Sequence, residues 1–345
     1  MKQIKKIIKL YGKDCDISKL KGVSLSDFKR QNEIQKTVSK SFLKKKYLET
    51  KKCIICNSKK IKFKTKILNI DFVQCSNCNH VFRKFYYEDK ILDDYWDKEG
   101  DLINVHSHVG QSNFRSKYLS DPKVKTVLKF VKKNKKKNKW VDLGCGNGEF
   151  LSQVRRRGVA AYGFDLNKKD IDLAKKKKLK VYKSDLNNFL KICNSKKIKF
   201  DIVSATGYFD MVNDPVKELK QVSKNMNKNG ILMIDVPDFN SVTHELIRFF
   251  PDISIRHLSG AQRSSFTLKS LKYFLKKNGF KILFRWHYGL DIYMIMNSLI
   301  HRNHNIENSN LMKTMTKRFN DFQKIFDEEE KSDTLFFIAK KIKNF

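Results

Sequence analysis

Two pairs of closely spaced cysteines are the first group of residues able to do chemistry. Cys53 and Cys56 are separated by two residues, as are Cys75 and Cys78, and 18 residues lie between the pairs. Two thiolates at this spacing can chelate one ion from a tight turn, and two such pairs match the spacing of tetrahedral zinc sites. Four thiolates leave no open coordination position, so the sequence predicts one structural Zn²⁺ on these four cysteines. His80 is the alternative to one of them.

A glycine-rich turn, Val-Asp-Leu-Gly-Cys-Gly-Asn-Gly at 141–148, is the second group. Gly144 permits a sharp turn, and Gly146 and Gly148 let the backbone approach a ligand without a Cβ in the way. The helix expected after the turn offers free N–H groups and the positive end of its dipole. A dinucleotide fingerprint would require a small residue where Glu149 stands. The alternatives at this point are a nucleotide site and a tight turn without a ligand.

These residues need a scaffold, and the apolar pattern predicts one from about residue 120 onward. Short apolar runs alternate with amphipathic segments, which is typical of a parallel sheet with helices on both faces. We expect strands at 140–143, 160–164, 180–182, 200–204 and 231–236, and helices at 149–157, 168–177 and 215–226. After Pro237 we expect no element until 265, then a helix at 268–277, a strand at 280–286, a helical region at 292–324 and a strand at 334–339.

From the glycine turn onward the sequence resembles class I S-adenosylmethionine-dependent methyltransferases. Residues 141–148 resemble the first motif of that family, and Tyr-Phe-Asp-Met-Val-Asn-Asp-Pro at 208–215 resembles a segment that usually reads V-L-E-H-V-x-D-P. The resemblance covers about residues 120–345. It implies an α/β fold, a Rossmann-like seven-stranded methyltransferase sheet with an antiparallel C-terminal hairpin. It also implies S-adenosyl-L-methionine as the cofactor.

The resemblance also implies which residues bind the cofactor. Asp165, at the end of the second expected strand, matches the acid that accepts the ribose hydroxyls. Asp185 and Leu186 match the segment that contacts adenine. The implied cofactor-binding set is Asp142, Gly144, Gly146, Gly148, Asp165, Asp185 and Leu186.

Three residues are candidates for catalysis: His257, Asp210 and Tyr208. Methyl transfer needs a general base only when the nucleophile is an alcohol or a carbon acid. The family's usual Glu-His is Asp210-Met211 here, so any role of that histidine is lost or moved. His257 precedes a Ser/Thr-rich segment that caps the active site in relatives. A structural imidazole at 257 and a packed aromatic ring at 208 are the alternatives.

The amino-acid composition limits the kinds of partner and the location that we expect for this chain. The 345 residues carry a formal net charge of +37, from 61 Lys and 12 Arg against 36 acidic residues. Arg is the residue suited to bidentate phosphate contacts, so the lysine excess is interpreted mainly as a solvated surface. No run approaches the ~18 apolar residues of a membrane helix. The basic start lacks the apolar core of a secretory signal, and an odd cysteine count argues against a disulfide framework. We therefore expect a cytoplasmic chain without a transmembrane segment.

The expected organisation has four parts. Residues 1–52 form a basic helical N-terminal segment, 53–82 a small N-terminal zinc ribbon, 83–119 a helical linker, and 120–345 the methyltransferase domain with a helical insertion at about 290–330.

The function expected is methyl transfer to a small-molecule acceptor, such as a nucleotide- or lipid-linked sugar. The alternative is an RNA methyltransferase whose ribbon holds RNA. A third hypothesis is a binding protein without activity, which Met211 would favour and the intact motif acids and glycines oppose.

Overall fold

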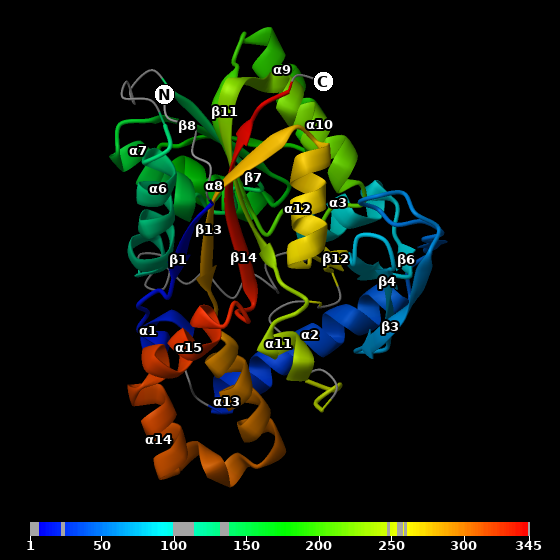
Figure 1. Cartoon of the computed structure of the whole chain (residues 1–345), viewed down its shortest axis with the longest axis vertical. Helices are drawn as coiled ribbons and strands as arrows, with labels where there is room; N and C mark the ends of the chain where they lie inside the picture. Colours follow the sequence, from blue (N-terminus) through cyan, green and yellow to red (C-terminus); the bar gives the residue numbers. More distant parts are fainter. Residues whose placement is uncertain are drawn as a thin grey trace.

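The computed structural model describes residues 7–21, 25–98, 114–131, 138–246, 249–253, 258 and 261–343. Its centre is a twisted eight-stranded sheet with helices on both faces (Figure 1). Across the sheet the strands are β1 (Ile8–Tyr11), β13 (Phe280–Tyr288), β14 (Thr334–Lys341), β11 (Met226–Pro237), β10 (Phe200–Thr206), β7 (Lys139–Leu143), β8 (Ala160–Asp165) and β9 (Lys180–Lys183). Only β14 runs antiparallel to its neighbours.

Two sets of helices bury the two faces of this sheet, as a parallel sheet with apolar residues on both faces requires. One face packs against α6 (Asp121–Leu128), α7 (Glu149–Arg156) and α8 (Lys168–Lys176). The other packs against α9 (Leu186–Ser195), α10 (Pro215–Asn225) and α12 (Leu268–Lys277). The alternation of strands and helices predicted from residue 120 onward is confirmed, and so is the antiparallel pairing of the last two strands.

All seven strands of the expected methyltransferase sheet are present, and an eighth strand joins them from the N-terminal segment. Residues near 8–11, expected to be a weak helix, form β1, which pairs in parallel with β13 from Ile8 opposite Phe284. Backbone and side-chain bonds tie its end to β13: the Gly12 N–H donates to the His287 carbonyl at 2.9 Å, and Trp286 Nε1 donates to the Gly12 carbonyl at 2.8 Å. The free edge of β13 supplies these partners, which a local pattern does not reveal. The β13–β14 pair is therefore covered and is not the sheet edge.

A second, four-stranded sheet holds the cysteine pairs. Its order is β12 (Ser264–Ser265), β5 (Val81–Arg83), β4 (Ile70–Cys75) and β3 (Ile61–Ile67). The short β2 (Leu48–Glu49) and β6 (Phe85–Tyr86) pair nearby, and α3 (Asp89–Lys98) follows. Two expectations need correction: the stretch 83–119 begins as strand rather than helix, and the stretch 237–265 contains α11 (Val242–Glu245) and β12. Both short strands form by pairing with distant segments, so their own sequences carry little signal.

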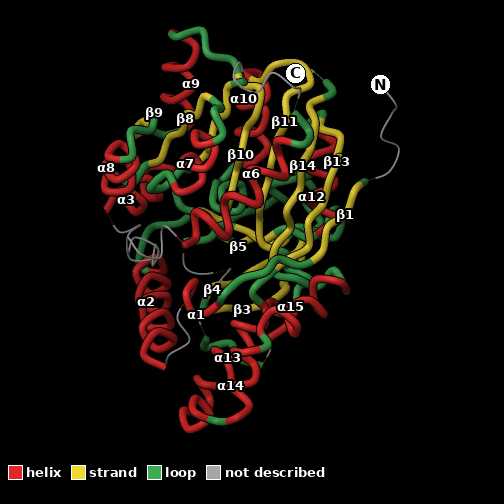
Figure 2. The backbone as a smooth tube through the Cα atoms, turned by 90° about the vertical axis from the view of Figure 1, so that its left-hand side faces the viewer, coloured by secondary structure: helices red, strands yellow, loops and turns green. Residues whose placement is uncertain are grey.

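Further helices gather at the carboxyl end of β13 (Figures 1 and 2). They are α1 (Ile17–Lys21), α2 (Leu25–Leu43), α13 (Asp291–Arg302), the 3₁₀-helix η4 (His304–Asn308), α14 (Asn310–Lys317) and α15 (Phe319–Glu328). The helical region predicted at 292–324 is confirmed. None of the helices in the described ranges is long and apolar enough to cross a membrane.

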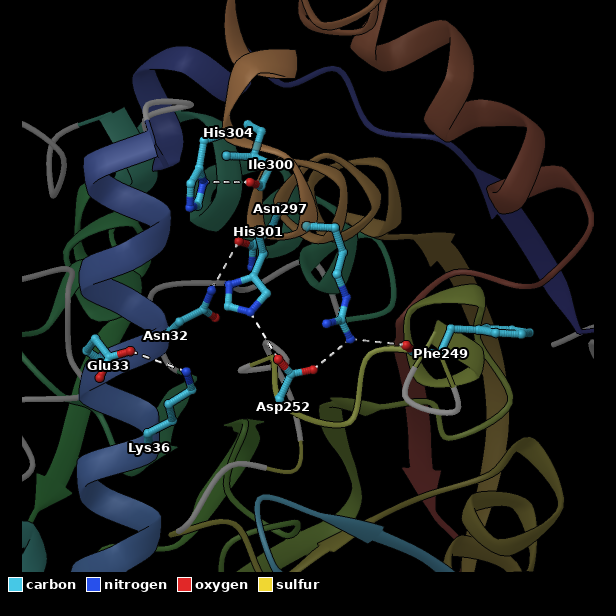
Figure 3. A network of polar contacts seen from close by, with 10 residues as sticks. Asn32, Glu33, Lys36, Phe249, Asp252, Asn297, Ile300, His301 and His304 are labelled. Atoms are coloured by element: carbon cyan, nitrogen blue, oxygen red, sulfur yellow. Dashed lines mark hydrogen bonds and ion pairs between the residues drawn. The ribbon is translucent and has the colours of Figure 1, made fainter.

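One polar network ties this helical part to the loop before residue 254 (Figure 3). Asp252 accepts from Arg302 at 2.9 Å and lies 3.1 Å from His301 Nε2, both at the end of α13. One turn before His301, Asn297 contacts Asn32 of α2 at 3.5 Å. The loop that leads toward residue 257 is thus held by side chains of α13.

Candidate active site

The glycine turn lies at the carboxyl end of β7, where ligands bind in open α/β sheets. Gly144 and Gly146 have φ of +65° and +49°, a region that other residues rarely adopt. A Cβ on Gly144 would lie 3.1 Å from the Tyr208 ring, whereas one on Gly146 would meet only an Asp170 oxygen at 3.8 Å. Gly146 therefore leaves open space above the backbone, as close approach of a ligand requires.

Asp165 ends the next strand, β8, and is held against this turn. Its carboxylate accepts the Gly146 N–H and the Asn167 N–H, each at 2.9 Å. Burial raises its pKa, and the backbone hydrogen bonds partly offset that rise. The contact fixes the carboxylate beside the glycine backbone.

A cavity of about 530 Å³ opens at the carboxyl ends of β7, β8, β9 and β10. Six residues of the predicted sets line it: Gly144, Gly146, Asp165, Asp185, Leu186 and Tyr208. The structure therefore brings together residues from four different strand ends. Met211 also lines the cavity; it stands at the position where the family usually has histidine.

Two predicted cofactor residues do not line the cavity. Asp142 is buried, and its carboxylate accepts the Ser204 hydroxyl at 2.5 Å, with burial raising its pKa to about 7. Gly148 has φ +78° at the start of α7, where a Cβ would lie 2.3 Å from Leu179 Cδ1. These two residues therefore determine the shape of the turn and do not line the cavity.

Helix α3 covers one side of the cavity and was not predicted to take part. Leu92, Asp93 and Trp96 reach the cavity from this helix, and Glu218 reaches it from α10. Burial, followed by the charges of Asp89 and Asp185, raises the pKa of Asp93 to about 6. No local motif marks α3, because its role comes from its packing against the methyltransferase-like sheet.

The cavity is acidic although the chain is strongly basic. Its lining holds six carboxyl groups and one lysine, Lys217; the acids are Asp89, Asp93, Asp165, Asp185, Asp214 and Glu218. Carboxylates repel the pyrophosphate of a dinucleotide and attract a cation, since the field in a cleft is set by the charges that line it. This arrangement suits a nucleoside that carries a positive group.

The three catalytic candidates end up in different surroundings. Tyr208 lines the cavity, and burial, followed by the charge of Glu218, raises the pKa of its phenol. Burial also raises the pKa of Glu218 to about 7. Asp210 lies outside the cavity lining, 1% exposed, and accepts from Gln262 Nε2 at 2.7 Å. Its other oxygen has no hydrogen-bond partner in the part of the chain that the structure describes. His257 lies outside the described residues.

The four cysteines come together at the tip of the small sheet. Cys53, Cys56, Cys75 and Cys78 place their sulfur atoms within 4.8 Å of one another, and two of the Sγ···Sγ distances are 3.5 Å. Zn–S bonds of about 2.3 Å in a tetrahedron imply Sγ···Sγ distances of about 3.8 Å, so the four residues fit one tetrahedral ion. His80 is not part of this cluster; its ring is buried against Phe82 and Phe266.

The cysteine-bearing sheet is joined to the loop that carries Asp210. Strand β12 continues this sheet by pairing with β5. Arg263, just before β12, is buried and donates to the Arg83 carbonyl at 2.7 Å and to Thr50 Oγ1 at 2.8 Å. The Arg263 and Ser264 N–H groups donate to the Asp210 carbonyl at 3.1 and 2.9 Å. The small sheet thus supports the segment at Asp210, whose next residues, Met211 and Val212, line the cavity.

Comparison with known proteins agrees with this geometry. Residues 114–283 match a family model described as a methyltransferase domain. The matched residues, a little under half of the chain, are similar to methyltransferase domains. The strand order of the main sheet agrees with the class I methyltransferase fold that the resemblance predicted.

A curated protein is similar to a smaller part of the chain. A ubiquinone biosynthesis O-methyltransferase of Pelagibacter ubique (strain HTCC1062) is 32% identical over 151 residues, which are 42% of this chain and 60% of that protein. The chain thus spans less than two thirds of this curated relative.

Two solved structures are also similar. The plantazolicin methyltransferase BpumL in complex with SAH is 15% identical, with a TM-score of 0.46, 73% of this chain and 94% of that chain being covered. A SAM-dependent methyltransferase from Archaeoglobus fulgidus is 18% identical, with a TM-score of 0.43 and coverages of 66% and 98%.

Proposed function

We propose that this protein transfers the methyl group of S-adenosylmethionine to a hydroxyl group of a small molecule. The observation that carries the proposal is the acidic cavity beside the glycine turn, with six carboxyl groups against one lysine. S-adenosylmethionine is a nucleoside with a permanent positive charge, so this lining favours it over a dinucleotide.

The residues that line the cavity contact different parts of the cofactor. Gly144 and Gly146 allow close approach of the cofactor, and Asp165 accepts the ribose hydroxyls. Asp185 and Leu186 contact the adenine. Bound S-adenosylmethionine supplies an electrophilic methyl group on a sulfonium, and the chain mainly has to align the acceptor behind it. Such alignment is worth ~7–11 kcal/mol.

The acceptor we propose is a hydroxylated small molecule. The name of the Pelagibacter relative, a ubiquinone biosynthesis O-methyltransferase, supports oxygen as the methylated atom. A sugar-linked acceptor remains a prediction from the sequence. Tyr208 and His257 remain candidates for the general base, while the burial of Asp210 outside the cavity lining favours a supporting role for that residue.

RNA is the second candidate acceptor, and the exposed surface of strand β3 is the feature that favours it. The outer strand β3 exposes Phe63, at 63%, between the exposed Lys62 and the half-buried Lys64. An exposed ring among cations is a feature of single-stranded nucleic acid binding. The high lysine content of the whole chain weakens this argument.

Transfer of a labelled methyl group separates the two acceptors. We expect incorporation from labelled S-adenosylmethionine into a pool of small hydroxylated metabolites and none into total RNA above that of an Asp165→Ala control. Turnover is the readout because a chain of charge +37 will bind RNA non-specifically. Site-specific methylation of RNA would overturn the small-molecule proposal.

For the four cysteines we propose a structural Zn²⁺. The fit of four sulfur atoms to one tetrahedron supports this, and a closed set of four thiolates leaves no position for catalysis. Its part in the proposed function is to hold the sheet that supports Arg263 and the Asp210 segment.

The affinity for S-adenosylmethionine should fall as the pH falls from 8 to 5. Asp93 and Glu218 line the cavity with pKa values of about 6 and about 7. Above these values both carboxylates attract the sulfonium; below them protonation removes the attraction.

S-adenosylhomocysteine lacks the sulfonium charge and is the matched ligand for this test. Calorimetry at several pH values should show that the affinity for S-adenosylhomocysteine changes less with pH than the affinity for S-adenosylmethionine. In Asp93→Asn, the affinity for S-adenosylmethionine should change less with pH near pH 6 than it does in the wild type. Identical pH profiles for the two ligands would contradict the electrostatic account.

A further inference from the structure

A group of charged side chains lies at the carboxyl end of the sheet, one strand beyond the cofactor cavity. Asp235 on β11 is the register partner of Thr206 on β10, and Thr206 lines the cavity. Lys123 of α6 forms an ion pair with Asp235, and the Tyr288 hydroxyl donates to the same carboxylate oxygen at 2.8 Å. The strand order puts this group at the end of the cavity away from Asp185, which follows β9.

Lys13 is the member of this group whose charge is not matched. Its Nζ lies 4.6 Å from the centre of the Tyr288 ring and 5.8 Å from that of Trp286. No carboxylate of the described ranges forms an ion pair or a hydrogen bond with Lys13. Burial, and then the charge of Lys123, hold the pKa of Lys13 well below its usual value. The ring faces stabilise the ammonium but leave its N–H groups for a ligand.

Three cations lie close together around Lys13. Arg115 is paired with Glu149 at 3.2 Å and Lys123 with Asp235, whereas Lys13 has no carboxylate partner within the described ranges. A buried or half-buried charge without a counter-charge is costly, and an anionic ligand would supply the missing one.

We propose that Lys13 and Lys123, beside the ring of Tyr288, form a subsite for an anionic oxygen group, a carboxylate or a phosphate, of the methyl acceptor. The inference rests on the proposed methyl transfer, because that reaction places the acceptor at the end of the cavity next to β11. The acceptor would then be a hydroxylated acid or phosphate ester, anchored by its anionic end with its hydroxyl toward the methyl group. The N-terminal segment, which adds β1 to the sheet, would supply the specificity of the enzyme.

Inorganic phosphate is a direct probe of this subsite, read by tryptophan fluorescence because Trp286 lies beside Lys13. Titrations are made at constant ionic strength on the full chain, alone and saturated with S-adenosylmethionine. We expect a saturable response in both states. Lys13→Met should raise the half-saturating phosphate concentration at least about tenfold, the loss of one charge-assisted hydrogen bond. Lys13→Arg should keep it within about threefold, because Arg retains the cation and its N–H donors.

Lys281→Met is the matched control, because Lys281 lies exposed on the same strand as Trp286 and its replacement changes the net charge equally. It should leave the titration unchanged. No saturable response, or an equal response in Lys13→Met, would overturn the proposal. Competition between phosphate and S-adenosylmethionine would also overturn it, since the subsite would then hold the cofactor's own carboxylate. Failure of the proposed methyl transfer is seen separately, as absence of S-adenosylmethionine binding by calorimetry.

Discussion

Asp165→Ala should weaken S-adenosylmethionine binding by at least about 100-fold. A carboxylate that accepts two ribose hydroxyls makes two charge-assisted hydrogen bonds, each worth ~1.5–3 kcal/mol, so losing both costs ~3–6 kcal/mol. In the structure the carboxylate is already fixed beside the cavity by the N–H groups of Gly146 and Asn167. Calorimetry with wild type and variant gives the ratio of dissociation constants.

The variant also removes acceptors from two backbone N–H groups, so a control must share that loss. Asp201→Ala comes near to it, because Asp201 accepts one backbone N–H, that of Lys139, and the side-chain amide of Asn227, each at 2.8 Å, and lies at the opposite end of β10 from the cavity. We expect similar losses of thermal stability in the two variants and loss of cofactor only in Asp165→Ala. Unchanged binding in Asp165→Ala would remove Asp165 from the site.

Cys53→Ser combined with Cys56→Ser should remove the metal and unfold the small sheet. Structural zinc contributes ~10–16 kcal/mol in small zinc-binding peptides, far more than so small a sheet can replace. Metal analysis should fall from near one zinc per chain to near zero. Hydrogen exchange should rise in β3, β4 and β5. It should also rise in β12, which belongs to the methyltransferase part of the chain and pairs with β5.

Cys193→Ser is the control for loss of a buried thiol, because Cys193 is 1% exposed and lies on α9 outside the cluster. It should keep the zinc and the exchange pattern of β3 to β5. Full zinc content in the double variant would contradict the four-cysteine site, and unchanged exchange in β12 would contradict the coupling to the Asp210 segment.

The parts of the fold that could be predicted from the sequence are those set by local chemistry. The glycine turn, the strand ends at Asp165 and Asp185 and the two cysteine pairs all carry a spacing with a physical meaning, and the structure brings each group together. Helix α12 was placed at its observed bounds, Leu268–Lys277, where Thr267 accepts the Ser270 N–H as an N-cap.

The parts that could not be predicted depend on partners far away in the chain. Strand β1 exists because β13 offers a free edge, and β12 exists because it pairs with β5. The role of α3 follows from its packing over the cavity, and that of Lys13 from the rings of β13 beside it. Asp210 was a catalytic candidate from its place in a motif; the structure shows it buried outside the cavity lining, where it accepts from Gln262, an arrangement that depends on the distant segment carrying Gln262.

The central claim is that the acidic cavity binds S-adenosylmethionine, and equilibrium binding to the purified chain tests it most directly. Calorimetric titrations with S-adenosylmethionine and with NAD, under the same conditions, compare a nucleoside carrying a cation with one carrying a pyrophosphate. We predict one S-adenosylmethionine per chain, competition by S-adenosylhomocysteine and no binding of NAD. Binding of NAD in its place, or of neither ligand, would contradict the account.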